Sequence, residues 1–263
     1  MQKLKKERIK ILGAYGTRSI NKGTSSILLN SKRVIDAGNL LEALREESVM
    51  IEEIWLTHSH LDHIVDIAYI IDNYFTQRIK SLKIMGLPQT LKALKEHFLN
   101  DAIWPDFSII KMAIGDENVI EYIPIEIGKK YKISENEFIE AFASDHTVAS
   151  CGYIYERNSS RILIGTDTYS LDNYIDILDN NHDIKSCILE CSFSNEMEIL
   201  AKASKHLTPK LLFQQLQKLQ RDDLLIYINH IKPIYEEKIS AQIEQYKGKW
   251  QVEIIKDGFF LTF

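Results

Sequence analysis

Cysteine is scarce in this sequence: its 263 residues include three, at positions 151, 187 and 191, and no two of them have the CxxC spacing. This argues against a disulfide framework and favours free thiols in a reducing cytoplasm. Proline is also rare, with five residues, and no Ser/Gly/Pro-rich linker divides the chain. We therefore expect one domain over residues 1–263 and a cytoplasmic location.

Long apolar runs and an excess of positive charge are also missing. No segment approaches the length of a membrane span, so we expect no membrane partner. The N-terminal stretch MQKLKKERIKILGAYG is as basic as the start of a signal peptide, but no apolar stretch of the needed length follows. The net charge of −5 makes nucleic acid a disfavoured partner.

Short apolar runs alternate with helical patterns along the chain, which is typical of α/β or layered αββα architecture. Strands are predicted at 8–13, 25–29, 32–36, 52–57, 82–85, 138–143, 151–156, 161–165, 186–190, 224–228 and 250–255. Helices are predicted at about 62–78, 88–99, 172–179, 195–204, 208–221 and 235–246.

Histidine is concentrated in one place: three of the eight histidines lie between positions 58 and 63, in LTHSHLDHIVD. Residues two apart at a strand end point to the same side, so His58 and His60 can form a chelating pair. Asp62 and His63 follow where the chain turns into a helix, and the turn can aim them at a neighbouring point. The motif predicts ligands for two metal ions, and a polar helix start with incidental histidines is the alternative.

A site with two metals needs further ligands, and open α/β sheets place their chemistry at strand ends. His146, Asp167 and His230 each follow a predicted apolar strand directly. Any one of them alone would be read as a capping or surface residue. Together with the HxHxDH turn they indicate one metal centre, because clusters rather than lone residues mark such sites.

These residues resemble the metallo-β-lactamase fold superfamily of αββα dinuclear hydrolases. The resemblance implies a four-layer sandwich of two mixed β-sheets flanked by helices. It implies one metal bound by His58, His60 and His146, a second bound by Asp62, His63 and His230, and Asp167 as the bridge. Asp36, in VIDAG, would support the ligands without binding metal.

Seven stretches in family order sharpen the resemblance to class II cyclic-nucleotide phosphodiesterases: HSHLDHI, AIWPDF, DHTVASCGY, ILIGTDT, LECSF, KHLTP and NHIKP. This implies hydrolysis of a 3′,5′-cyclic nucleotide, with cyclic AMP as the expected substrate and the 5′-monophosphate as product. Lys205 stands where the family usually has glycine, and VDIAYIID replaces small residues after HLDHI. His-rich ligation favours two Zn²⁺ ions, with Mn²⁺ or Fe²⁺ as alternatives.

Glu190 and His206 are predicted to approach the same strand-end cleft. A phosphodiester hydrolase must protonate its leaving oxygen, and an imidazole held by a carboxylate is a suitable donor. In related phosphodiesterases of this fold the matching residues are assigned that role, and we place both with Asp62 among the catalytic residues. A strand-end glutamate and a histidine near a helix start are the alternative.

Trp104 and Phe107 are candidates to stack on the base of the substrate, although loop packing explains them as well. His97 and His182 are predicted to lie on the surface, and Cys191 is predicted to be packing rather than a nucleophile.

Two other functions stay open. One is a tRNA 3′-processing endoribonuclease or another phosphodiesterase of this fold, although no basic Gly/Pro-rich arm for tRNA is visible. The other is a non-catalytic sensor of nucleotide or metal. The expected partner is a small cyclic nucleotide, and a homodimer is compatible with the sequence.

Overall fold

A computed structural model describes residues 7–263; residues 1–6, the first part of the basic N-terminal stretch, lie outside the described residues. Two seven-stranded β-sheets form its centre. The first sheet has the order β14 (Phe260–Thr262), β1 (Arg8–Gly13), β2 (Ser26–Asn30), β3 (Arg33–Ile35), β4 (Glu53–Trp55), β5 (Leu82–Gly86) and β6 (Ile120–Pro124).

The second sheet has the order β13 (Gln251–Ile254), β12 (Leu225–Asn229), β11 (Ser186–Glu190), β10 (Ser160–Ile164), β9 (Ser150–Arg157), β8 (Glu137–Ser144) and β7 (Lys130–Ser134). Both sheets are mixed. In each, three neighbouring pairs are antiparallel and three are parallel.

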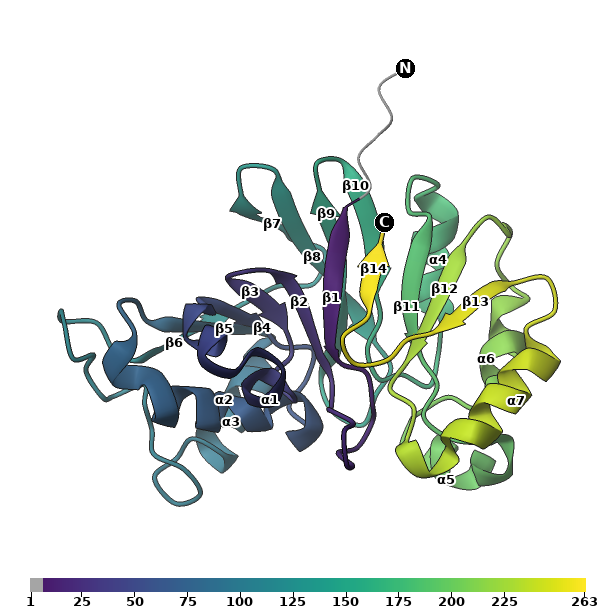
Figure 1. Cartoon of the computed structure of the whole chain (residues 1–263). Helices are drawn as coiled ribbons and strands as arrows, with labels where there is room; N and C mark the ends of the chain where they lie inside the picture. The colour runs from purple at the N-terminus through teal and green to yellow at the C-terminus, as the bar shows by residue number, and fades with distance from the viewer. Residues whose placement is uncertain (1–6) are drawn as a thin grey trace.

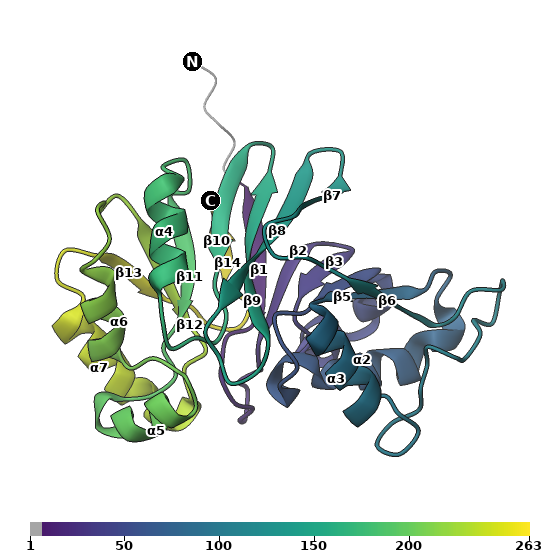
Figure 2. The same ribbon diagram turned by 180° about the vertical axis from the view of Figure 1, so that it is seen from behind.

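Helices cover the outer face of each sheet, as the two opposite views show (Figure 1 and Figure 2). The first sheet carries α1 (Leu40–Leu44), α2 (Leu61–Tyr74) and α3 (Pro88–His97), with the 3-10 turns η1 (Arg45–Met50) and η2 (Phe75–Gln77). The second carries α4 (Asp172–Asn180), α5 (Glu198–Ala203), α6 (Pro209–Leu216) and α7 (Glu236–Tyr246), with η3 (Asn195–Met197) and η4 (Pro233–Tyr235). The predicted four-layer αββα sandwich is therefore confirmed.

Three hydrophobic clusters fill the spaces between these layers. The cluster between the sheets combines residues of both, such as Ile11, Trp55, Tyr153 and Ile162. The other two lie between each sheet and its helices. Strand β11 is buried at all five positions because both of its faces are covered, whereas the burial of β8 alternates along its first half.

All eleven predicted strands and all six predicted helices are present, with ends displaced by a few residues. The prediction missed β6, β7, β14 and α1. The helix predicted at 62–78 ends at Tyr74 and continues as η2, and the helix predicted at 208–221 ends at Leu216. The missed strands β6, β7 and β14 lie at sheet edges and have one buried residue at most, so no buried apolar run marks them.

The carboxyl ends of β4, β8, β10, β11 and β12 lead into the loops that hold the predicted site residues. Strands β10, β11 and β12 are parallel, so they place their following residues at one edge of the sheets. Among residues 7–263, no helix combines the length and apolarity that a bilayer crossing demands.

Candidate metal centre

The HxHxDH motif lies where the chain passes from β4 into α2. His58 and His60 belong to the extended segment before the helix, and His60 occupies its N-cap position. Asp62 and His63 lie in the first turn, where the positive end of the helix dipole favours a carboxylate. One short stretch therefore presents four potential ligand side chains from two adjoining backbone conformations.

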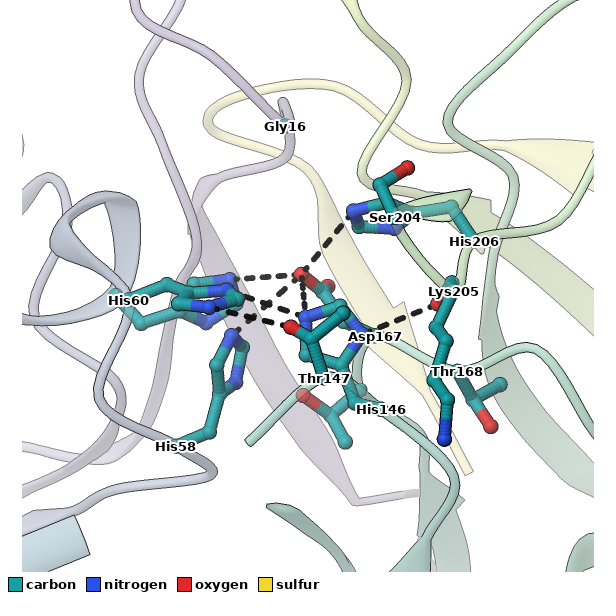
Figure 3. A network of polar contacts seen from close by, with 12 residues as sticks. Gly16, His58, His60, His146, Thr147, Asp167, Thr168, Ser204, Lys205 and His206 are labelled. Carbon is teal, nitrogen blue, oxygen red and sulfur yellow. Dashed lines mark hydrogen bonds and ion pairs between the residues drawn. The ribbon is translucent and has the colours of Figure 1, made fainter. Parts of the chain in front are cut away.

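A first group of side chains surrounds the carboxylate of Asp167, as Figure 3 shows for His58, His60 and His146. The Nε2 atom of His146 lies 3.1 Å from Nδ1 of His60. Asp167 Oδ2 lies 3.6 Å from His58 Nε2 and 3.8 Å from His146 Nε2. Four ligand atoms within such distances can hold one metal ion.

A second group consists of Asp62, His63 and His230. The Nε2 atoms of His63 and His230 are 3.2 Å apart. Asp62 Oδ2 lies 3.3 Å from Nε2 of His230 and 3.8 Å from Nε2 of His63. All seven predicted ligand side chains therefore lie in two adjoining groups, although the loops that carry them are far apart in the sequence.

Asp167 lies between the two groups and its carboxylate contacts both. Its Oδ1 is 3.1 Å from His230 Nε2, whereas its Oδ2 faces His58 and His146 and lies 3.5 Å from His63 Nε2. The side chain is almost fully buried. A carboxylate in this position can bridge two cations.

Oxygen atoms around the groups fix the orientation of the imidazoles. His63 Nδ1 lies 2.7 Å from Asp36 Oδ2, and His146 Nδ1 lies 3.0 Å from the carbonyl oxygen of Lys205. The Nδ1 atoms of His58 and His230 face the hydroxyls of Thr57 and Ser192 at 3.0 and 2.9 Å. An N–H donated outward leaves the inner Nε2 lone pair free for a metal.

The prediction that Asp36 supports the ligands agrees with these contacts. Besides His63, its carboxylate accepts hydrogen bonds from the backbone N–H and the hydroxyl of Thr57, both at 2.8 Å. Thr57 in turn contacts His58, so Asp36 orients both ligand groups through one buried network.

One buried polar atom of the first group has no protein partner, which fits a site for a metal ion. His58 is fully buried, yet its Nε2 atom has no hydrogen-bond partner, which is costly unless a ligand satisfies it. Burial, reinforced by the charge of His63, holds the pKa of His58 well below its usual value. A neutral imidazole with a free inward lone pair suits a metal ion.

Electrostatics in the second group point the same way. Burial opposes charge on His63, but the carboxylates of Asp36, Asp167 and Asp62 outweigh it, so the pKa of His63 is raised well above its usual value. Burial also opposes charge on Asp62 and Asp167, but nearby histidines hold the pKa of each carboxyl below its usual range. The clustered carboxylates are therefore stabilised by positive charge nearby, which bound divalent ions can supply instead of protons on the histidines.

Glu190 and His206 form a buried pair beside this centre. Glu190 ends β11, and its Oε1 atom lies 2.9 Å from His206 Nδ1. The same carboxylate accepts hydrogen bonds from the backbone N–H groups of Thr168 and Leu207. His206 Nε2 is then directed toward Asp167 Oδ2, 4.0 Å away, so the sequence-predicted pair meets the metal ligands.

Ser192 links this pair to a metal ligand, and the sequence analysis missed it. Its hydroxyl lies 2.9 Å from Glu190 Oε2, 2.9 Å from His230 Nδ1 and 3.1 Å from His206 Nδ1. A hydroxyl donates one hydrogen bond and accepts two, so Ser192 can serve all three neighbours. Its position two residues after Glu190, just past the end of the same strand, could have indicated that it lies near the site.

The two departures from the family pattern have structural explanations. Lys205 adopts a φ of 53°, the left-handed region that favours glycine, while its ammonium pairs with Asp145 at 2.5 Å. Asp66, within VDIAYIID, is buried and accepts a hydrogen bond from the backbone N–H of Leu41 at 2.8 Å. It therefore caps α1, whose own N-cap residue Asn39 makes no side-chain cap.

For Phe107 the structure favours packing, the alternative to stacking on the substrate. Its ring is 3% exposed and packs in the cluster between the first sheet and its helices, with the ring of Phe75 at 5.7 Å. Trp104 is half-buried and meets the ring of Tyr69 edge-on at 5.7 Å. Tyr69, and not Trp104, lines a groove that also includes Asp62.

The remaining predictions on single residues agree with the structure. Cys151, Cys187 and Cys191 are free and buried. Burial raises the pKa of the Cys191 thiol well above its usual value, so this residue is packing rather than a nucleophile. His97 and His182 are exposed.

Solved structures share this fold over nearly the whole chain. Unliganded yeast PDE1 superposes with a TM-score of 0.83 and 20% identity, covering 97% of this chain and 99% of that one. YhfI from Bacillus subtilis, described as a metallo-beta-lactamase fold protein, gives 0.75 with 16% identity, covering 98% and 100%. The fold, with its cluster of potential metal ligands, is that of the metallo-β-lactamase class.

Sequence comparison then assigns the family. Residues 4–152 match the model of the cAMP phosphodiesterases class-II, which is more than half of the chain. The chain therefore belongs to this family. The 3′,5′-cyclic-nucleotide phosphodiesterase 1 of Saccharomyces cerevisiae is 36% identical over 95 residues, which span 34% of this chain and about a quarter, 26%, of the yeast enzyme.

Proposed function

We propose that this protein is a phosphodiesterase that hydrolyses 3′,5′-cyclic nucleotides, cyclic AMP foremost, to the 5′-monophosphate with two bound divalent ions. The observation that carries the proposal is Asp167, whose carboxylate contacts both groups of ligands and lies beside His206. Family membership supports the choice of a phosphodiester substrate.

In this proposal His58, His60 and His146 would hold one ion, Asp62, His63 and His230 would hold the other, and Asp167 would serve both. Five imidazoles among seven ligands favour zinc, although Mn²⁺ and Fe²⁺ accept the same donors. Bound ions would supply Lewis-acid stabilisation of the phosphoryl oxygens and make an attacking water more acidic.

In this proposal His206, oriented by Glu190, supplies the proton for the leaving group. Glu190 holds His206 through Nδ1, which leaves Nε2 to carry a proton toward the centre. Burial opposes charge on His206, but Glu190 and Asp167 outweigh it and raise the pKa of the imidazole. His206 is therefore suited to protonate the 3′ oxygen as its bond to phosphorus breaks.

A tRNA-processing activity on the same fold has less support. Substrates of that kind need a basic surface, and the longest loop of the described residues, 98–119, holds four acidic residues and one lysine. A pure sensor is also less well supported, because such a protein has no need for the buried proton donor pair beside the ligands.

The test is an assay of the purified, zinc-loaded protein against 3′,5′-cyclic AMP, cyclic GMP, a cyclic dinucleotide and a precursor tRNA. We expect turnover of the cyclic mononucleotides to the 5′-monophosphates, with loss of activity on chelation and recovery on adding metal. Cleavage of the precursor tRNA alone, or tight nucleotide binding without turnover, would replace the proposal with one of its two alternatives.

A further inference from the structure

A groove of about 440 Å³ opens beside the metal centre and includes Asp62 in its lining. Its volume lies in the range of pockets that hold small organic ligands. Where it approaches the ligands it is bounded by Gly16, at which a Cβ atom would come within 2.6 Å of His230 Nδ1. The groove is therefore continuous with the second ligand group.

One wall of the groove is an apolar stripe on α2. Leu61, Val65 and Tyr69 follow one another at intervals of four residues, so they lie on one side of the helix. Leu61 is 60% exposed and Tyr69 is 42% exposed, whereas Ile64, Ile67, Ala68, Ile70 and Ile71 fill the core face. The fold does not need this stripe for packing, and it begins next to a potential metal ligand.

The stripe ends in an aromatic face that is held in place. The ring of Trp104 meets Tyr69 edge-on, with the centroids 5.7 Å apart and the planes at 74°. An aromatic ring that lines a groove and is supported from one side is suited to stack against a planar ligand. Trp104 thus supports the stacking surface instead of providing it.

The opposite wall carries positive charge. Lys232 donates a hydrogen bond to the carbonyl oxygen of Gly16 at 3.0 Å and lies 5.2 Å from the ring centre of Phe193, and neither contact neutralises its ammonium. Arg18 also lines the groove and pairs with exposed Glu42 at 2.9 Å. The ammonium of Lys232 beside the potential metal centre attracts an anion, and the apolar stripe suits a ligand with an apolar, planar part.

We propose that this groove binds the base and ribose of a purine mononucleotide whose phosphate lies at the metal centre, with Tyr69 as the face on which the base stacks. The inference rests on the proposed function and adds the subsite that recognises the nucleoside. A volume of about 440 Å³ suits one nucleoside, so the groove favours cyclic mononucleotides over larger phosphodiesters.

The experiment compares two ligands that share the phosphate and differ in the base. Binding of 5′-AMP and of ribose 5-phosphate to the full-length, zinc-loaded protein is measured by calorimetry for the wild type, Tyr69→Ala and Tyr69→Phe. We expect Tyr69→Ala to weaken 5′-AMP on the order of 5- to 100-fold while ribose 5-phosphate changes little. Tyr69→Phe keeps the ring and should keep the affinity of both.

Tyr69 is exposed and off the core face, so both variants should fold, and circular dichroism verifies this. Equal affinity of the two ligands for the wild type, or equal weakening of both by Tyr69→Ala, would overturn the nucleoside subsite. Turnover of bis(p-nitrophenyl) phosphate by the same samples tests the proposed function separately, because that substrate reports on the metal centre without any nucleoside.

Discussion

His206 Nδ1 and Glu190 Oε1 lie 2.9 Å apart, both side chains are buried, and His206 Nε2 lies 4.0 Å from Asp167 Oδ2. The carboxylate is also fixed by two backbone N–H groups, so it cannot turn away from the imidazole without losing three hydrogen bonds. The pair therefore holds one imidazole nitrogen toward the reaction centre in a defined orientation.

The first prediction concerns the role of His206. Replacing it with alanine should reduce hydrolysis of cyclic AMP by roughly 10²- to 10⁴-fold, because the 3′ alkoxide is a poor leaving group that needs a proton. Hydrolysis of bis(p-nitrophenyl) phosphate should fall far less, since nitrophenolate leaves without one. Steady-state kinetics on both substrates measure this, with His182→Ala as the exposed-histidine control. Equal losses on both would remove the proton-donor role.

A second prediction concerns Ser192, whose hydroxyl joins His230 to Glu190. Ser192→Ala should weaken binding of the second metal on the order of 10- to 100-fold, because His230 loses the partner that fixes its Nδ1 proton. It should also lower turnover of cyclic AMP more than turnover of bis(p-nitrophenyl) phosphate.

The matched control is Ser194→Ala, a buried serine in the same loop that lies outside this network. Metal titration and kinetics are measured on both variants. Unchanged metal affinity in Ser192→Ala, or an equal loss in Ser194→Ala, would show that the hydroxyl does not position the ligand.

A third prediction concerns the metal content. Asp167→Ala should reduce bound metal per chain well below that of the wild type, because each ligand group loses an oxygen donor. Elemental analysis after loading and gel filtration measures this, with the exposed Asp176→Ala as control. Full occupancy in Asp167→Ala would contradict the bridging position.

Metal removal should also lower the thermal stability of the wild type. Chelation leaves buried histidines and carboxylates to repel one another or to take up protons, and a ligand that binds the folded state alone raises its free energy of unfolding. Differential scanning fluorimetry with and without chelator should show a lower melting temperature for the stripped protein. Identical melting temperatures would mean that the cluster holds no tightly bound ion.

A fifth prediction concerns stability against pH at Glu137, which joins the two sheets. Its carboxylate accepts hydrogen bonds from Tyr155 and Arg157, both at 2.6 Å, and from Asn30 of the other sheet at 2.9 Å. Burial opposes its charge, but these bonds outweigh burial and lower the pKa of Glu137 below the ordinary 4.5. Its contribution is therefore present above pH 4.5 and is lost as the pH falls through the lowered pKa.

Glu137→Gln should accordingly cost about 1–3 kcal/mol of unfolding free energy at pH 7, and the difference from the wild type should shrink as the pH falls below 4 or so. Denaturant unfolding across this pH range measures it. Glu140→Gln, on the same strand but outside the network, is the control and should stay close to the wild type. A Glu137 effect that does not vary with pH would exclude the charged network as its cause.

Most residues of the candidate centre could be predicted from the sequence, because each potential ligand lies in a recognisable local pattern. His58, His60, Asp62 and His63 belong to one turn, whose backbone alone aims them together. His146, Asp167 and His230 could be selected because each directly follows a buried strand, and parallel strands end at one edge of a sheet. Strands with a run of buried apolar residues could be predicted in the same way. The edge strands β6, β7 and β14, which are mostly exposed, could not.

What the sequence by itself determined was thus the fold class, the family and the donor atoms of the centre, since these depend on local pattern and order along the chain. Tertiary structure alone decided which side chains surround them. Packing buried Phe107, and it brought Ser192 to His230 across 38 residues of chain. Such contacts depend on how whole layers pack against each other, and no short stretch of sequence encodes that arrangement.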